Sequence, residues 1–102
     1  MSTYFIKGIP VKVLNNMVEE LRLKGLWTER HSYSLRIMYN NRFVASLHLY
    51  PGFNEAVLKL ISGDPFINSR IRSIVKEVMS IYLSGYVVRE VEVENVLDMY
   101  NA

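Results

Sequence analysis

Cysteine is absent from this 102-residue chain, and its absence excludes several kinds of site at once. Without thiols, the chain has no disulfide framework, no thiolate-bound zinc and no cysteine nucleophile. Histidine occurs only as His31 and His48, and neither has a second histidine or a carboxylate at the spacing of metal ligands. The sequence therefore predicts neither a metal site nor a bound cofactor.

Long apolar runs are also missing. The unbroken apolar stretches are only a few residues long, whereas a membrane-spanning helix needs about 20. The first residues lack the basic and then apolar pattern of a secretion signal. We therefore expect a protein of the cell interior, without a membrane segment, folded as one domain over residues 1–102.

The chain lacks the common catalytic motifs as well. It has no phosphate-binding loop, no glycine-rich dinucleotide turn, no nucleophile elbow and no zinc-binding helix. Its grouped carboxylates, Glu19-Glu20 and the alternating Glu90, Glu92 and Glu94, are typical of solvated faces and of protected strand edges. The sequence predicts a protein that is not an enzyme.

Glycine and proline, which number five and three, occur at ordered places. Gly8-Ile9-Pro10 and Gly63-Asp64-Pro65 each follow a strand-like run and precede a helical pattern, which ends near Gly25 or Gly85. This shared order suggests an internal duplication, with copies over roughly 3–39 and 55–94. Chance is the alternative, because few other residues match and because Gly and Pro end many unrelated helices.

Apolar spacing predicts helices over 11–24 and 65–84, with Gly25 as a left-handed C-cap and Asp64 as an N-cap. Alternation predicts strands over 3–8, 33–39, 43–50, 55–62 and 86–94. The expected fold is α+β, a two-layer domain built from two similar β-α-β motifs, with about five strands and two main helices. Whether the motifs share one sheet or form two lobes is left open.

The faces of the strands follow from the same alternation. An odd-length turn at Asn40-Asn41, with Asn41 left-handed, would pair Ile37 with Phe43 and so separate apolar from polar residues. The outer face of this hairpin then carries Ser34, Arg36, Ser46 and His48. A type II turn is expected at Pro51-Gly52. In the last strand, Val91 and Val93 are expected to point inward and Glu90, Glu92 and Glu94 outward.

Charge is unevenly divided along the chain, although the net charge is only +2. Residues 1–50 carry seven basic and three acidic residues, a net +4, and residues 51–102 carry five and seven, a net −2. The two halves would attract one another in a homodimer, or they form separate solvated faces. The alternative hypothesis is a nucleic-acid-binding protein. Its binding surface would consist of Arg30, Arg36 and Arg42 on or beside the hairpin, with Arg70 and Arg72 on the second helix.

The favoured reading is a non-enzymatic protein–protein interaction module. Large amphipathic side chains near the ends of elements are typical interface anchors. On this ground Trp27 and Tyr86 are predicted to bind a partner, together with Arg36, His48 and Tyr50. We expect a peptide or partner chain to dock at the seam between the two motifs or along a free strand edge.

The general character of the chain adds a resemblance. Short, free of cysteine, rich in Ile, Val, Tyr and Asn and without motifs, it resembles the small orphan proteins of filamentous viruses of hot-acid archaea, of the Acidianus filamentous virus type. The resemblance implies a viral protein in the cytoplasm of the host cell. It assigns no role to any residue.

Overall fold

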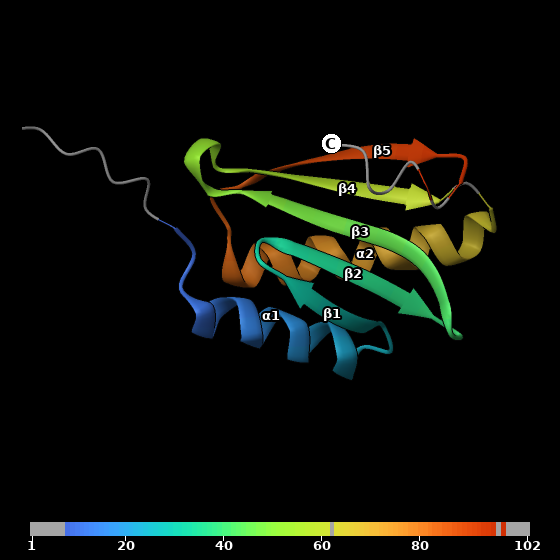
Figure 1. Ribbon diagram of the computed structural model, residues 1–102, viewed down its shortest axis with the longest axis horizontal. Helices are drawn as coiled ribbons and strands as arrows, with labels where there is room; N and C mark the ends of the chain where they lie inside the picture. The colour runs from blue at the N-terminus through green and yellow to red at the C-terminus, as the bar shows by residue number, and fades with distance from the viewer. Residues whose placement is uncertain (1–7, 62, 96, 98–102) are drawn as a thin grey trace, which may run out of the picture.

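A computed structural model describes residues 8–61, 63–95 and 97 of the chain (Figure 1). In chain order its elements are α1 (Val11–Leu23), β1 (Trp27–His31), β2 (Ser34–Tyr39), β3 (Arg42–Tyr50), a short 3₁₀ turn (Pro51–Phe53), β4 (Glu55–Ile61), α2 (Pro65–Tyr82) and β5 (Val87–Val93). The predicted α+β fold, with two main helices and five strands, is confirmed.

All five strands form one sheet in the order β1-β2-β3-β4-β5. Neighbours from β1 to β4 pair antiparallel, and α2 then carries the chain over to β5, which pairs parallel to β4. The segments assigned to the two motifs therefore share one mixed sheet rather than forming two lobes.

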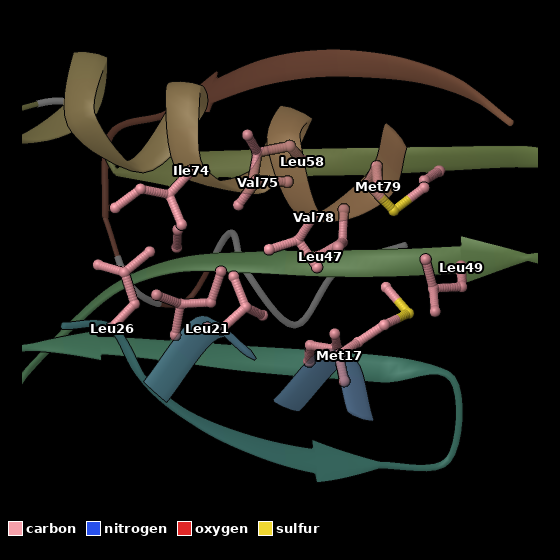
Figure 2. Close-up of a cluster of buried hydrophobic side chains, with 14 of the residues drawn as sticks. Met17, Leu21, Leu26, Leu47, Leu49, Leu58, Ile74, Val75, Val78 and Met79 are labelled. Carbon is pink, nitrogen blue, oxygen red and sulfur yellow. The ribbon is translucent and has the colours of Figure 1, made fainter. Parts of the chain in front are cut away.

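Both helices lie on the same face of the sheet (Figure 1). They contact each other, and one continuous core fills the space between them and β2, β3 and β4. Figure 2 shows side chains of this core from both helices, from the connection between α1 and β1 and from the central strands: Met17, Leu21, Leu26, Leu47, Leu49, Leu58, Ile74, Val75, Val78 and Met79. Neither α1 nor α2 covers the other face of the sheet, which we call the open face.

The helices begin and end close to the predicted positions. In α1 the predicted stripe is buried at Leu14, Met17, Val18 and Leu21, and Gly25 adopts the expected left-handed conformation at φ 94°. At the start of α2 the Asp64 carboxylate accepts the Phe66 N–H at 2.9 Å, so the predicted N-cap is confirmed. This bond satisfies one of the free N–H groups of the first turn.

Strand β1 was not predicted. Its segment lacks apolar alternation, because Thr28 is its only buried residue and the other four side chains are exposed. The predicted strand over 3–8 falls almost wholly on residues 1–7, outside the described residues. Among the described residues, the five strands therefore begin with β1 and not with the predicted strand over 3–8.

The β2–β3 hairpin differs from the predicted register. Asn40 and Asn41 form a two-residue turn, both with positive φ, and Tyr39 pairs with Arg42. A bulge then shifts the pairing, so that Ile37 lies opposite Ala45 and not opposite Phe43. The predicted odd-length turn was wrong, but the left-handed conformation of Asn41 is confirmed. The bulge adds one residue to a strand, which separates the apolar and polar faces as one extra residue in the turn would.

The side chains of β5 point opposite to the prediction. Glu90 lies opposite Leu58 of β4, on the helix-covered face, and its carboxylate contacts Arg72 Nε at 2.7 Å and Lys76 Nζ at 3.2 Å. Val91 is on the open face and 44% exposed, with Val93 on the same side. The prediction was wrong because basic residues of α2 provide partners for an acid that would otherwise be excluded from that face.

The connection between β3 and β4 is also not the predicted type II turn. Pro51–Phe53 is a 3₁₀ turn, and Asn54, not Gly52, has the left-handed conformation, with φ 51°. Asn tolerates this conformation better than most residues. The Asn54 carbonyl then accepts the Val87 N–H at 2.9 Å, which ties the turn to the start of β5.

The duplication is not confirmed. The described residues contain one complete β-α-β unit, β4-α2-β5. The matching opening strand of the first copy lies outside the described residues, and β1 continues into an antiparallel hairpin. The segment that would repeat this unit is thus not established as a second copy.

Candidate partner-binding site

A pocket of about 490 Å³ opens where the start of α1 meets the end of α2. Ile9, Pro10 and Val13 line it from the N-terminal side, and Leu83 and Tyr86 from the C-terminal side. Gly8, Tyr82 and the turn that contains Pro51, Gly52 and Asn54 complete the wall. Because it joins the segments proposed as the two motifs, we call it the seam pocket.

Apolar side chains form most of this wall, and two tyrosines and Asn54 supply polar side-chain groups. Tyr86 and Tyr82 are partly buried and pack against the core. Burial raises the pKa of the Tyr86 hydroxyl, and the nearby Tyr33 raises it further. Tyr86 therefore keeps its proton at neutral pH and can donate a hydrogen bond, as suits an amphipathic interface residue.

The close approach of the chain to Tyr33 shapes one side of the pocket. A Cβ atom placed on Gly8 would overlap the Tyr33 hydroxyl. Glycine at this position lets the segment before α1 pass directly beside the tyrosine. The pocket wall therefore depends on Gly8, which the sequence analysis identified only as the end of a strand.

Four predicted outer-face residues do gather on the open face. Ser34 and Arg36 of β2 lie opposite His48 and Ser46 of β3, as predicted. The Ser46 hydroxyl is 2.8 Å from His48 Nε2, and the Ser34 hydroxyl is 3.1 Å from His48 Nδ1. A neutral imidazole has one donor and one acceptor nitrogen, so it can bond both hydroxyls at once.

Burial lowers the pKa of His48, and the positive charge of Lys59 on β4 lowers it further. The folded state therefore disfavours the protonated ring. The contacts of His48 are those of a satisfied neutral side chain. Its part in partner binding, predicted from the sequence, has no further support from this geometry.

Lowering the pH below about 6.5 is expected to destabilise the fold through His48. Because the folded pKa is lowered, the unfolded chain takes up the proton first, and the free energy of unfolding falls as the pH falls. His48→Gln removes this contribution, whereas His31→Gln, on exposed β1, leaves it in place. Urea denaturation at a series of pH values measures it. If the free energy of unfolding of His48→Gln depends on pH as it does in the native protein, His48 is not the source of the pH dependence.

The other predicted anchors lie apart from the seam pocket. Trp27 is 53% exposed at the start of β1; the Arg22 guanidinium lies 4.1 Å from its ring centroid, and its Nε1 donates to Glu29 at 3.3 Å. Tyr50 ends β3 and is 37% exposed. Of the five predicted anchors, only Tyr86 lines the seam pocket.

The five arginines of the nucleic-acid reading do not form one surface. Arg36 lies on the open face, 5.3 Å from the Phe43 ring centroid. Arg30 pairs with core-facing Leu35 in the sheet and so projects from the opposite face. Arg42 starts β3 on that side, beside a second pocket of about 500 Å³ near the start of α2.

The two helix arginines are placed differently again. Arg72 is paired with Glu90, and Arg70 is exposed on α2, near Gly25. A third hollow, of about 540 Å³, lies beside Trp27 and the Asn40-Asn41 turn. Like the seam pocket, each of these two hollows is lined by one predicted residue, Trp27 or Arg42.

Two features are absent from the described residues. No three His, Cys, Asp or Glu side chains among them are placed to hold a metal ion. In the same part of the chain, no helix has the length and apolar character needed to cross a membrane.

No protein-family model, curated protein or solved structure matches the chain. The geometry and chemistry of its own residues therefore carry the functional argument.

Most of the lining of the seam pocket was not singled out from the sequence. The seam was predicted as a place for binding, and Tyr86 as an anchor, but Ile9, Val13, Tyr82 and Leu83 were not predicted as binding residues. Val13 lies beside the buried stripe of α1, and Leu83 follows the last turn of α2. Large apolar or aromatic side chains near the ends of the two helices were the available sequence signal for this lining.

Proposed function

We propose that the chain is a non-enzymatic interaction module that binds a peptide or partner chain at the seam pocket. The observation that carries this proposal is the pocket itself: an apolar hollow, with tyrosine donors, between the start of α1 and the end of α2. Such concave sites with few polar groups are typical of binding sites for side chains and small ligands.

The pocket favours one large apolar side chain of the partner as an anchor. Its lining residues carry no charge, so a charged group would lose hydration without gaining an ionic partner there. An aromatic or branched aliphatic side chain would instead displace water from Ile9, Val13 and Leu83. Buried anchors of this type supply most of the affinity in protein interfaces.

Nucleic-acid binding has less support. Arginines divided between two faces, with Arg72 already paired, do not provide the continuous basic track that follows a phosphate backbone. Of the five predicted arginines, only Arg36 lies on the open face.

The setting proposed for this module is viral, in the cytoplasm of the host cell. It rests on the resemblance to small proteins of archaeal filamentous viruses. Expression during infection, followed with an antibody against the chain in fractionated host cells, is the measurement that tests it.

Peptides selected from a random displayed library on the immobilised protein test the binding function. We expect selected sequences to share one large apolar residue. Tyr86→Ala removes part of the pocket wall and Val13→Phe fills the pocket, so each is expected to weaken the selected peptide at least about tenfold. Fluorescence anisotropy measures the affinities, and thermal melting checks that each variant folds.

Phe66→Ala is the matched control, because Phe66 is 81% exposed at the far end of α2 from Tyr82. It should leave the affinity unchanged. A library without binders, or a selected peptide that binds both pocket variants as tightly as the native protein, would show that the seam pocket is not the site.

A further inference from the structure

The outer edge of the sheet at β5 is unpaired among the described residues. The Val87 N–H points toward β4, since it donates to the Asn54 carbonyl. Backbone groups alternate along a strand, so Arg89, Val91 and Val93 also face β4. Val88, Glu90 and Glu92 therefore direct their N–H and C=O groups outward, where a further strand can pair with them.

The opposite edge, at β1, is partly closed. Arg22 of α1 donates from Nε to the Thr28 carbonyl at 3.0 Å and also covers the Trp27 ring. An incoming strand would have to displace this side chain before it could pair there. The two edges lie at opposite sides of the sheet (Figure 1), and among the described residues β5 is the less covered of the two.

The side chains of β5 differ between its two faces. On the open face Val87 and Val91 are 61% and 44% exposed. On the other face Glu90 already has two cationic partners, but Glu92 forms no ion pair with any described residue. Arg89 lies between these two valines on the open face, and its guanidinium is 3.9 Å from the Glu55 carboxylate. The edge thus offers two exposed valines beside a paired arginine on one face and an unneutralised carboxylate on the other.

A second copy of the chain fits this edge poorly in the registers centred on its middle. In a twofold dimer the two β5 strands would run antiparallel with like faces aligned. If the twofold axis passes through Glu90, the two copies of Glu90 lie opposite one another, and an axis through Arg89 does the same to the two copies of Arg89. An axis through Val91 places Glu90 of one copy opposite Glu92 of the other. Like charges directly opposite destabilise a strand pair.

We propose that the β5 edge accepts an extended partner strand in which basic residues alternate with apolar ones. The basic residues would lie beside Glu92 and the apolar ones beside Val87 and Val91. Because Tyr86 lines the seam pocket and Val87 begins β5, the pocket and the β5 edge are adjacent along the chain. The inference thus rests on the proposed function and names the chemistry of its partner.

Two fluorescent peptides of about ten residues test this, one alternating lysine with valine and one alternating glutamate with valine, each with a phenylalanine at either end. The lysine peptide should bind at least about tenfold more tightly, and its affinity should fall with added salt. Equal affinities, or no binding by the lysine peptide, would overturn the inference.

Glu92→Pro and Glu92→Ala separate backbone pairing from charge. Proline removes an outward N–H without touching the ladder to β4, and edge strands tolerate it. Alanine removes only the carboxylate. The lysine peptide should bind Glu92→Pro about tenfold more weakly than Glu92→Ala. Equal binding by the two variants would exclude strand pairing at this edge.

Amide hydrogen exchange supplies a readout that does not depend on a variant's folding. In the free protein the Arg89 and Val91 amides should exchange slowly, and the Val88, Glu90 and Glu92 amides fast. The lysine peptide should slow exchange at the second set of amides; no change there would overturn the proposal.

If Tyr86→Ala abolishes peptide binding and Glu92→Pro does not, the proposed function stands and the edge inference fails. The reverse result places binding at the edge alone.

Discussion

Leu21→Asp is expected to unfold the protein. Leu21 is fully buried on the inner face of α1, where it belongs to the core shared with the sheet. An aspartate there would either ionise without a partner or stay protonated without hydrogen bonds, at a cost of several kcal/mol. That cost approaches the roughly 5 to 15 kcal/mol by which a domain is stable. Circular dichroism and thermal melting measure the outcome.

Leu23→Asp is the matched control on the same helix. Leu23 is 80% exposed, so the same change should alter the free energy of unfolding by no more than about 0.5 kcal/mol. Native-like melting of Leu21→Asp would contradict the placement of α1 against the sheet.

Leu58→Ala is expected to cost roughly 2 to 5 kcal/mol in the free energy of unfolding. Leu58 lies on β4, flanked by β3 and β5 and fully buried beneath the helices (Figure 2). Neighbours fixed by strand pairing on both sides cannot easily collapse into the cavity, which favours the upper part of this range.

Urea denaturation measures the loss, and one cooperative transition is expected because one core joins both helices and the sheet. Val91→Ala is the control, since Val91 is 44% exposed on the open face. A change below 1 kcal/mol is expected there, and an equal effect of the two substitutions would contradict the assignment of faces.

Elements with a clear apolar period were predictable from the sequence. The stripe of α1 and the capping residue Asp64 give local signals that do not depend on distant partners. The polar outer face of the hairpin was predictable too, because alternation alone places Ser34, Arg36, Ser46 and His48 on one side.

Features that depend on tertiary contacts were not predictable. Strand β1 has one buried residue, Thr28, so nothing in its own pattern distinguishes it from a loop. The reversed faces of β5 follow from Arg72 and Lys76, which are distant in sequence from Glu90 but meet it in the folded chain. Local alternation cannot anticipate such partners.

The candidate site shows the same division. Tyr86 was predicted from its size and its place at the end of an element, and the seam was predicted from the order of the segments. The lining by Ile9, Val13 and Leu83 needs the start of one helix to meet the end of the other, which only packing determines. Arg36 and His48 were grouped correctly with each other but belong to another surface.

Backbone amide chemical shifts of the isotope-labelled protein, recorded during titration with a library-selected peptide, test the central claim most directly. Binding at the seam pocket predicts that the largest shift changes occur at Ile9, Val13, Tyr82, Leu83 and Tyr86, and that they saturate together. Changes centred instead on Arg36 and His48 of the open face, with the pocket amides unmoved, would contradict the account.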